Sequence, residues 1–479
     1  MQLAPDSASD PKVREAILTA DRHFQNGKFF MQEGKPEDAR GEFERAVEAL
    51  LLGLPEDHPD FTLLSRKTEE LGRLILRYEV ERLGSGRPHE SPVYVKSPLG
   101  ELLDLTFPVD PRAKNQAISQ VKALASQLPL TVNDAVASYI TFFSTVERGR
   151  KTFLFGMKRA ARYRPMIERI LAEEGVPQEL LHLAQAESGF MPMALSPKAA
   201  AGMWQFIRGR GNEYGLRQSQ WHDDRLDPEK ATRSAARHLR DLYEQLGDWY
   251  LAMAAYNCGP GCIERAVQRT GYADFWELRN RNVLPAETRN YVPAILAMAI
   301  IAKNPGLYGL ELMPGDEPLH YDTIRLTSPT NLGLIADAAD RPVSDIRDMN
   351  PSLVRNVAPG DYELRVPKGA SGGILAALDM VPPEKRLSWR LHRIGAGDTL
   401  VSIAKRFAIA PKSIVAVNAR LGETKVEDSP EGDVLIIPVA ARPAPAVRAS
   451  RTGARPATRT AGRKPASKVA QVRPAARRS

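Results

Sequence analysis

The stretch PQELLHLAQAESGF, residues 177–190, has the pattern of one short, complete helix. Pro177 suits a first helical turn, and apolar residues such as Leu181 recur at helical spacing. Gly189 takes the position where helices commonly end. The stretch therefore predicts a helix whose last turn carries an acidic residue, Glu187.

The same signals recur further along the chain. Asp227 and Pro228 provide an N-cap and a first-turn proline, and Gly247 closes the apolar stripe that follows them. Further helical patterns cover residues 249–257 and 288–302. No strand alternation of comparable strength occurs between residues 126 and 304, so we predict an all-α domain there.

Residues 318–440 contain an internal repeat. Leu334-Ile335-Ala336, Ile346, Asn350 and Leu353 are followed 68 residues later by Ser402-Ile403-Ala404, Ile414, Asn418 and Leu421. Each unit has the pattern of a short strand, two short helices and a short strand. We predict two small α+β modules, residues 318–368 and 389–440, joined by a linker at 369–388.

The N-terminal region, residues 1–125, is predicted to be helical. Residues 20–52 form two amphipathic stretches broken at 33–36, and their Ala, Phe and Gly pattern resembles one tetratricopeptide unit. Stable arrays of that kind need three or more units, so an ordinary helical hairpin is the open alternative. Residues 84–115 are rich in Gly, Pro and Ser and are predicted to be a loop or linker. The chain as a whole is predicted to be mainly α.

The positive charge of the chain comes from its last residues. The 479 residues carry a net charge of +8, while residues 441–479 alone hold eleven Lys and Arg and no acid, which leaves −3 on the rest. This tail has almost no large apolar side chain, so we predict that it is disordered. A basic core that binds nucleic acid is not implied, and a hydrophobic content of 43% excludes a wholly disordered chain.

Several common sites are excluded by the residues present. Two cysteines, Cys258 and Cys262, cannot form a four-cysteine zinc site. Their spacing leaves a local disulfide open without requiring one. The sequence holds no phosphate-binding loop, no HExxH and no GxSxG, and His182 has no metal partner at a suitable spacing, so we interpret it as structural. We predict no metal and no cofactor.

Glu187 has surroundings that favour a neutral carboxyl group. Its neighbours in the sequence are mostly apolar: Leu181, Leu183, Ala184, Ala186, Phe190 and Met191. Burial disfavours the carboxylate, and so does the negative end of the helix dipole, so both raise the pKa. A carboxylic acid protonated near neutral pH can donate a proton to a leaving oxygen. A solvated glutamate at a helix end is the alternative on these grounds alone.

Three further motifs strengthen the catalytic interpretation. They follow AESGF in order along the chain: AGMWQF at 201–206, AYNCGPG at 255–261 and ETRNYV at 287–292. Together the four motifs resemble those of the lytic transglycosylases of the lysozyme-like superfamily, over residues 126–304. The resemblance implies a lysozyme-like, all-α catalytic domain.

The resemblance also implies an activity. The family cleaves the β-1,4 bond between N-acetylmuramic acid and N-acetylglucosamine in peptidoglycan and leaves 1,6-anhydromuramyl ends. Glu187 would protonate the glycosidic oxygen and then act as base for the muramyl 6-hydroxyl. Ordinary glycosidases need two carboxylates, but here the nucleophile belongs to the substrate, so one can serve both steps.

Other residues match substrate-binding positions of the family. They are Ser196, Met203, Gln205, Tyr256, Asn257, Glu287 and Tyr291. Tyr256 is expected to bond near the reacting sugar or the catalytic carboxyl group. Core packing is the alternative for Met203 and Tyr291, and a helix cap is the favoured alternative for Asn257.

The two repeat units resemble LysM modules, which the same family carries and which bind N-acetylglucosamine-containing glycans. The second unit, with GDTL at 397–400, matches better than the first, which has PTNL at 329–332. Sugar binding by the first unit is therefore in doubt. The basic tail is expected either to attract anionic wall polymer or a membrane surface, or to be a solubilising extension.

Two rival functions stay open. A hydrolase of the goose-lysozyme type would use the same fold and release reducing ends, with Glu287 activating water. A non-enzymatic peptidoglycan-binding protein is the other, although intact Glu187, Gln205, Tyr256 and Glu287 argue against it.

The expected location follows from the substrate class. Residues 1–12 lack the layout of a secretory signal, and no apolar run reaches the roughly 18 residues of a membrane span, so the chain has the look of a soluble, unexported protein. Peptidoglycan lies outside the cytoplasmic membrane. We therefore expect a periplasmic or envelope protein whose signal has been removed or lies upstream.

Overall fold

The computed structural model describes most of the chain between residues 9 and 439. The described ranges are 9–32, 36–50, 58–64, 66–68, 70–71, 107–196, 199–418, 421, 426 and 429–439. The predicted disordered tail, and most of the predicted linker at 84–115, lie outside them.

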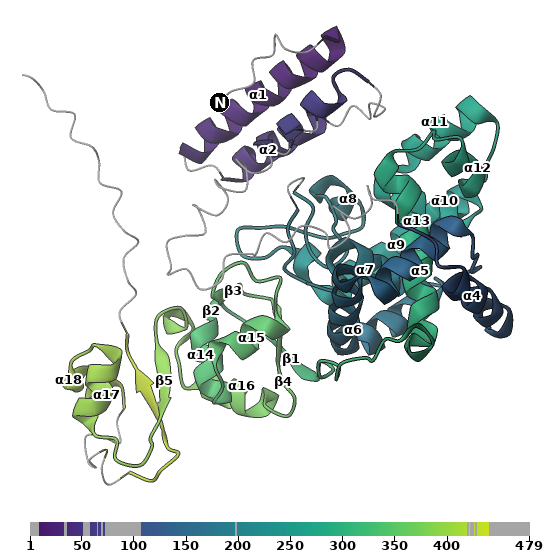
Figure 1. Ribbon diagram of the computed structural model, residues 1–479. Helices are drawn as coiled ribbons and strands as arrows, with labels where there is room; N and C mark the ends of the chain where they lie inside the picture. Colours follow the sequence, from purple (N-terminus) through teal and green to yellow (C-terminus); the bar gives the residue numbers. More distant parts are fainter. Residues whose placement is uncertain are drawn as a thin grey trace, which may run out of the picture. The chain divides into compact units, whose positions relative to one another are not determined.

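Two antiparallel helices form a hairpin near the N-terminus: α1 (Pro11–Gln32) and α2 (Pro36–Leu50). Figure 1 shows them side by side. Their apolar faces share a small core that includes Phe24 and Phe43. A side chain in place of Gly27 would put its Cβ 2.5 Å from the Phe43 ring, so this glycine permits the close approach of the two helices. Helical residues at 61–64, 66–68 and 70–71 add Leu64 and Leu71 to the same core.

Residues 111–308 form a helical region that contains the predicted all-α domain, residues 126–304. Its elements are α4 (Pro111–Ala123), α5 (Asp134–Thr145), α6 (Glu147–Glu173), η2 (Gln178–Leu180), α7 (Leu181–Ser188), α8 (Arg208–Glu213), η3 (Asp224–Leu226), α9 (Pro228–Leu246), α10 (Trp249–Cys258), α11 (Pro260–Thr270), α12 (Phe275–Asn280), α13 (Ala286–Lys303) and η4 (Pro305–Tyr308). The linker prediction was wrong at its end. Asp110 accepts a hydrogen bond from the Arg112 amide and Pro111 follows, which starts a helix by the same signal as Asp227-Pro228.

Helix α13 lies in the centre of this region. It packs against α5, α7 and α10, and its residues from Tyr291 to Ile301 are all buried. A helix that is apolar all round is a core helix. At the start of α13, Glu287 bonds to Asn257 of α10, and Tyr291 bonds to Glu187 of α7. Helix α13 therefore joins the fourth motif to the third and to the first.

The two repeat units have the predicted order of elements. The first has β1 (Tyr321–Arg325), α14 (Leu332–Ala339), α15 (Val343–Met349) and β4 (Glu363–Pro367), with a short extra pair, β2 (Thr330–Asn331) and β3 (Val357–Ala358). The second has β5 (Arg390–Arg393), α17 (Leu400–Phe407), α18 (Pro411–Val417) and β6 (Val434–Ile437). In each unit the outer strands pair antiparallel, β1 with β4 and β5 with β6.

One asparagine ties each unit together in the same way. The Asn350 side chain donates to the Ile346 and Arg365 carbonyls and accepts from the Arg365 amide. Asn418 makes the same three bonds, to the Ile414 carbonyl and to both backbone groups of Ile436. Arg365 and Ile436 are therefore structurally equivalent positions.

The segment predicted to link the units is ordered and belongs to the first unit's core. It contains α16 (Ser371–Asp379) and η5 (Pro383–Lys385). Ile374, Leu378 and Val381 are buried in the core built by α14 and β4. The linker prediction missed this helix because it is only nine residues long and two glycines, which favour loops, stand in its first turn.

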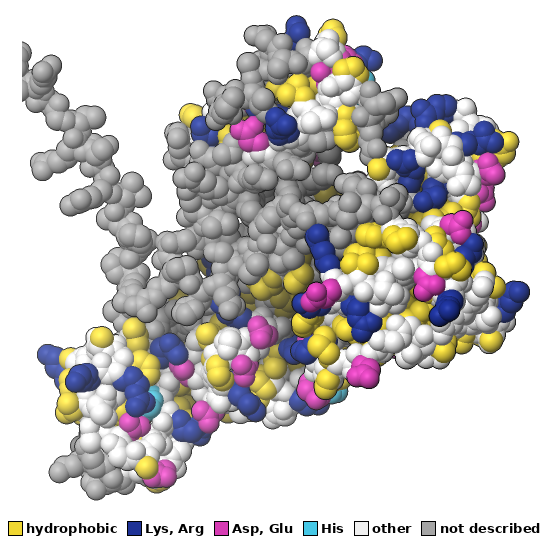
Figure 2. Space-filling model, in the orientation of Figure 1, with side chains coloured by type: hydrophobic (Ala, Val, Ile, Leu, Met, Phe, Trp, Pro, Cys, Tyr) yellow, Lys and Arg dark blue, Asp and Glu magenta, His cyan; other side chains and the backbone are white. Residues whose placement is uncertain are grey.

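The predicted fold class, mainly α with small strand-containing units after the helical region, is confirmed. Within the described residues, no helix combines the length and apolar character needed to cross a membrane. On the face seen in Figure 2, basic and acidic side chains of the described residues alternate and form no single-sign stripe.

Candidate active site

Glu187 lies in the last turn of α7, where the chain turns sharply. Gly189 has φ +61° and ends the helix, as predicted, and Phe190 follows with φ +63°. A non-glycine residue in this conformation is strained, so the surroundings must hold it. Phe190 is fully buried, and the Arg159 Nε of α6 donates to the Gly189 carbonyl at 2.6 Å.

Ser188, the next residue, connects this turn to the second motif. Its hydroxyl donates to the Met203 carbonyl at 2.8 Å and accepts from the Met191 amide at 3.2 Å. The AESGF and AGMWQF motifs are therefore joined directly by a buried hydrogen bond. Because Ser188 is fixed on one side, Glu187 is turned to the other, where it is half-buried.

Tyr291 of α13 meets Glu187 on that side. Its hydroxyl donates to Glu187 Oε1 at 2.6 Å, and the Tyr291 side chain is only 2% exposed. Burial, and then the nearby Glu187 charge, raise the pKa of Tyr291 well above its usual value, so this phenol remains a donor. Tyr291 is thus buried in the core, which was one of the two alternatives, and its hydroxyl is also a partner of Glu187, which the sequence did not predict.

Tyr256 of α10 is the second phenol beside Glu187. Burial raises its pKa well above the usual value, and the Glu187 charge adds to the rise. Its hydroxyl donates to the Trp204 carbonyl at 2.8 Å. Tyr256 therefore fixes the second motif next to Glu187.

Gln205 holds the second motif in a strained turn. Its φ is +50°, and its Nε2 donates to the Gly202 carbonyl at 2.7 Å and to the Ala194 carbonyl at 3.3 Å. Ala199 has a positive φ as well. Strained residues cluster at functional sites, and Phe190, Ala199 and Gln205 fall within sixteen residues of each other in the chain.

The apolar residues beside Gln205 are buried in the large helical core. They are Met203, Trp204 and Phe206. Met203 is 1% exposed, so it offers almost no surface to a glycan in this structure. The Trp204 indole donates to Thr232 Oγ1 of α9 at 2.9 Å. Ser196 lies further from the core, and its hydroxyl accepts from the Ala200 amide at 3.0 Å.

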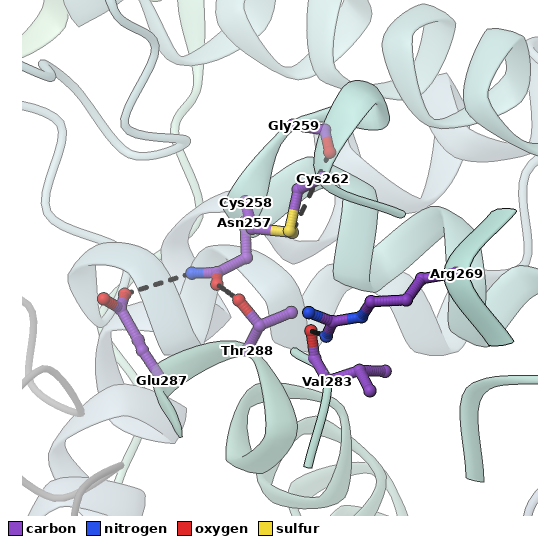
Figure 3. Close-up of a disulfide and its surroundings, with 8 residues drawn as sticks. All are labelled: Asn257, Cys258, Gly259, Cys262, Arg269, Val283, Glu287 and Thr288. Atoms are coloured by element: carbon purple, nitrogen blue, oxygen red, sulfur yellow. Dashed lines mark hydrogen bonds between the residues drawn. A yellow bond between two sulfur atoms is a disulfide. The ribbon is translucent and has the colours of Figure 1, made fainter. Parts of the chain in front are cut away.

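Asn257 and Glu287 form a separate polar group at the start of α13 (Figure 3). Asn257 Nδ2 donates to Glu287 Oε1 at 3.0 Å, and Asn257 Oδ1 accepts from the Thr288 hydroxyl at 2.6 Å. The expected helix cap by Asn257 is wrong, because Gly259 ends α10 and Asn257 joins α10 to α13 instead. The Glu287 side chain is exposed.

Cys258 and Cys262 form a disulfide beside Asn257 (Figure 3). It joins the end of α10 to the first turn of α11 across the Gly259-Pro260-Gly261 turn. The alternative that the spacing left open is therefore the one the structure adopts.

His182 is buried one turn before Glu187. Its Nδ1 lies 2.8 Å from Gln185 Oε1, and burial lowers its pKa to about 4, so the ring is neutral near pH 7. Among the described residues, no group of three or more His, Cys, Asp or Glu side chains is arranged to hold a metal ion. Both observations agree with the structural interpretation of His182.

Sequence analysis missed two residues of this site, Ser188 and Arg159. Ser188 lies inside the AESGF motif, and a serine directly before a C-cap glycine could have indicated a turn-forming hydroxyl. Arg159 is one of many basic residues on α6, and no pattern separates it from its neighbours.

Comparison with protein families finds two matches. Residues 164–279 match the family described as "Transglycosylase SLT domain", and residues 392–438 match the family described as "LysM domain". The first match spans Glu187, Gln205 and Tyr256, whereas Glu287 and Tyr291 lie beyond its end. The second match covers only the second repeat unit, as the motifs predicted.

Curated relatives point the same way. Membrane-bound lytic murein transglycosylase D of Escherichia coli (strain K12) is 34% identical over 281 residues, 55% of this chain and 61% of that protein. Peptidoglycan transglycosylase gp16 of Escherichia phage T7 is 32% identical over 160 residues, 33% of this chain and 12% of that protein. The chain thus spans less than two thirds of these relatives.

Among solved structures, the 70 kDa soluble lytic transglycosylase of Escherichia coli is 16% identical, with a TM-score of 0.28, over 64% of this chain and 50% of that chain. The resemblance inferred from the four motifs is confirmed by the family and sequence matches.

Proposed function

We propose that the chain is a lytic transglycosylase of peptidoglycan. The observation that carries the proposal is the bond between Tyr291 and Glu187: a half-buried carboxyl group at a helix end, held by a phenol from a core helix. The match of the surrounding residues to the transglycosylase SLT domain supports the substrate class.

Glu187 acts first as an acid and then as a base. Its proton passes to the oxygen that links muramic acid C1 to the next glucosamine, and the C1–O bond breaks. The muramyl 6-hydroxyl then attacks C1 and returns its proton to Glu187. The product is a 1,6-anhydromuramyl end, with no water consumed. The attack is intramolecular, so the substrate supplies a nucleophile at high effective concentration.

The strained second motif and the two phenols position the substrate and the carboxyl group. Gln205 and Ser196 bind the glycan, Tyr256 and Tyr291 support Glu187, and Asn257 and Glu287 contact the sugar farther along. Glu287 is exposed and bonded to Asn257, which suits glycan contact better than activation of a buried water.

The second repeat unit, residues 389–440, binds N-acetylglucosamine-containing glycan, and its match to the LysM domain supports this role. Binding there raises the effective concentration of glycan at the catalytic region. The basic tail, residues 441–479, adds attraction to anionic wall polymer or membrane surface.

The protein acts in the periplasm or cell envelope, where its substrate lies. The Cys258–Cys262 disulfide supports this location, because disulfides persist in oxidising compartments.

Mass spectrometry of fragments released from purified sacculi tests the proposed function. We expect anhydromuramyl ends. Reducing ends, heavier by one water, would identify a hydrolase instead, and sacculus binding without any release would identify a non-enzymatic binding protein.

A further inference from the structure

The first repeat unit is attached to the catalytic region by a buried ion pair. Arg365 of β4 donates from Nη1 to Asp227 Oδ2 at 2.6 Å and from Nη2 to Asp227 Oδ1 at 3.0 Å. The two side chains are 14% and 3% exposed. Paired donors on one carboxylate fix orientation as well as distance. Tyr321 of β1 adds a bond to Glu229 Oε2 at 2.9 Å.

Backbone bonds continue this attachment along a second segment. The Asp223 amide donates to the Ser352 carbonyl at 2.8 Å, and the Val354 amide donates to the Trp221 carbonyl at 3.0 Å. Residues 221–223 thus pair with 352–354, the segment that follows α15 in the first unit. Such pairing leaves those backbone groups of the first unit unavailable to a glycan.

The segment of the catalytic region that pairs with the first unit also contacts the second motif, AGMWQF. Arg225 Nη1 donates to the Ala199 carbonyl at 2.9 Å and to the Phe206 carbonyl at 3.2 Å. A Cβ on Gly202 would lie 1.8 Å from the Arg225 carbonyl oxygen, so the two backbones are in tight contact. Asp227 itself caps α9, which carries the Thr232 partner of Trp204.

The second unit has an apolar residue at the position equivalent to Arg365. Where the first unit has Arg365, the second has Ile436, as the shared asparagine bonds establish. Ile436 packs against the core of the first unit, and Arg390 at the start of β5 bonds to Asp337 of α14 at 2.5 and 2.7 Å. Each unit therefore contacts the part of the chain before it through the equivalent position of its last strand, Arg365 or Ile436, and through a residue of its first strand, Tyr321 or Arg390.

We propose that the first repeat unit is not a second glycan-binding module but a brace, by which we mean a unit that holds the catalytic region in its conformation. Its partner is the 217–229 segment of this same chain, and Arg365 is a positioning residue that acts through Asp227 and Arg225 on the turn at 199–206. The effect on catalysis rests on the function proposed above, whereas the attachment itself does not.

The test compares full-length Arg365→Gln with Arg390→Gln. Each change removes a two-bond arginine–carboxylate pair that the first unit makes with a neighbouring part of the chain. Arg365 joins the first unit to the catalytic region, whereas Arg390 joins the second unit to the first. Hydrogen exchange is followed in peptides covering 199–206, 217–229 and α13, together with kcat and KM for glycan cleavage. We expect Arg365→Gln to lose protection in the first two segments and to lower kcat by about tenfold or more, since small misplacements far from the chemistry have effects of that size. Arg390→Gln should leave the exchange protection of these two segments and kcat unchanged.

Two further variants keep the test decisive. Arg365→Lys retains the charge but not the paired bonds, and should restore part of the protection. Loss of protection in α13 would indicate that Arg365→Gln destabilises the whole catalytic region. In that case Asp227→Asn, which still caps α9 but loses the ion pair, replaces Arg365→Gln as the test variant. If the test variant that keeps α13 protected also keeps wild-type protection at 199–206 and 217–229, the proposed bracing role of the first unit is wrong. If the wild-type protein cleaves no glycan, the proposed function fails while the exchange result still decides the brace.

Discussion

The two glutamates of the catalytic region have opposite surroundings. Glu187 is half-buried at a strained turn and accepts a bond from a phenol that is itself buried. Glu287 is exposed at the start of a helix and accepts from an amide side chain. A group that must exchange a proton with substrate benefits from the first setting, and a group that contacts a polar ligand suits the second.

This difference supports the proposal that a single carboxyl group serves both steps. An inverting or retaining glycosidase places its two carboxyl groups across the scissile bond, and both take part in the reaction. Of the two glutamates compared, Glu187 has the fixed, partly desolvated position that suits acid–base catalysis, and Glu287 does not. The following predictions test this contrast.

Glu187→Gln should have the largest effect. The amide keeps the size of the side chain and can accept from Tyr291, but it cannot donate a proton to the leaving oxygen. We expect glycan cleavage to fall by about 10²–10⁴-fold, measured as fragments released from sacculi. Sacculus binding should be unchanged. Activity close to wild type would remove Glu187 from the mechanism.

Tyr291→Phe should have the next largest effect and a characteristic pH dependence. The tyrosine hydroxyl stabilises the ionised form of Glu187, so its removal should raise the pKa of that carboxyl group. Because the acid must be protonated, the alkaline limb of the pH–rate profile should move to higher pH. A hydrogen bond to a charged group is worth about 1.5–3 kcal/mol, so we also expect the cleavage rate at the optimum pH to fall by about 10- to 100-fold. An unmoved alkaline limb would contradict this role.

Glu287→Gln is the matched control for the first change. The same substitution at an exposed position should cost less than about tenfold in cleavage, mainly through KM, since one glycan contact is altered. A loss of about 10²–10⁴-fold in kcat would instead identify Glu287 as a general base and favour the hydrolase.

Removal of the disulfide should have the smallest effect on catalysis. The double change Cys258→Ser with Cys262→Ser frees a very short loop, for which chain entropy predicts a loss of about 2 kcal/mol in unfolding free energy. Denaturant unfolding would measure it. Cleavage should stay within about twofold of wild type, since Asn257 is held by Thr288 and Glu287 as well. A larger loss of activity would place the disulfide among the supports of the site.

The sequence predicted the elements of the fold better than their contacts. Helix ends marked by Gly189 and Gly247, and starts marked by Asp227-Pro228, are local signals that the structure confirms. The repeat also predicted both small units. The helix at 371–379 escaped because its burial depends on a core assembled from distant strands.

Within the site, the motifs identified both Glu187 and Tyr291, but not the hydrogen bond that joins them. Tyr291 lies 104 residues further along the chain, and only the path of α13 through the core brings its hydroxyl to the carboxyl group. The attachment of Arg365 to Asp227 likewise joins residues 138 positions apart. Such pairs leave no local pattern, because a strand arginine and a helix-capping aspartate are each common alone.

The most direct measurement is cleavage of sacculi in water enriched in heavy oxygen. If Glu187 uses the muramyl 6-hydroxyl as the nucleophile, the new ends take no oxygen from the solvent, and mass spectrometry should find unlabelled anhydromuramyl products. Labelled reducing ends formed at the rate of cleavage would show that water is the nucleophile and would contradict the single-carboxyl account.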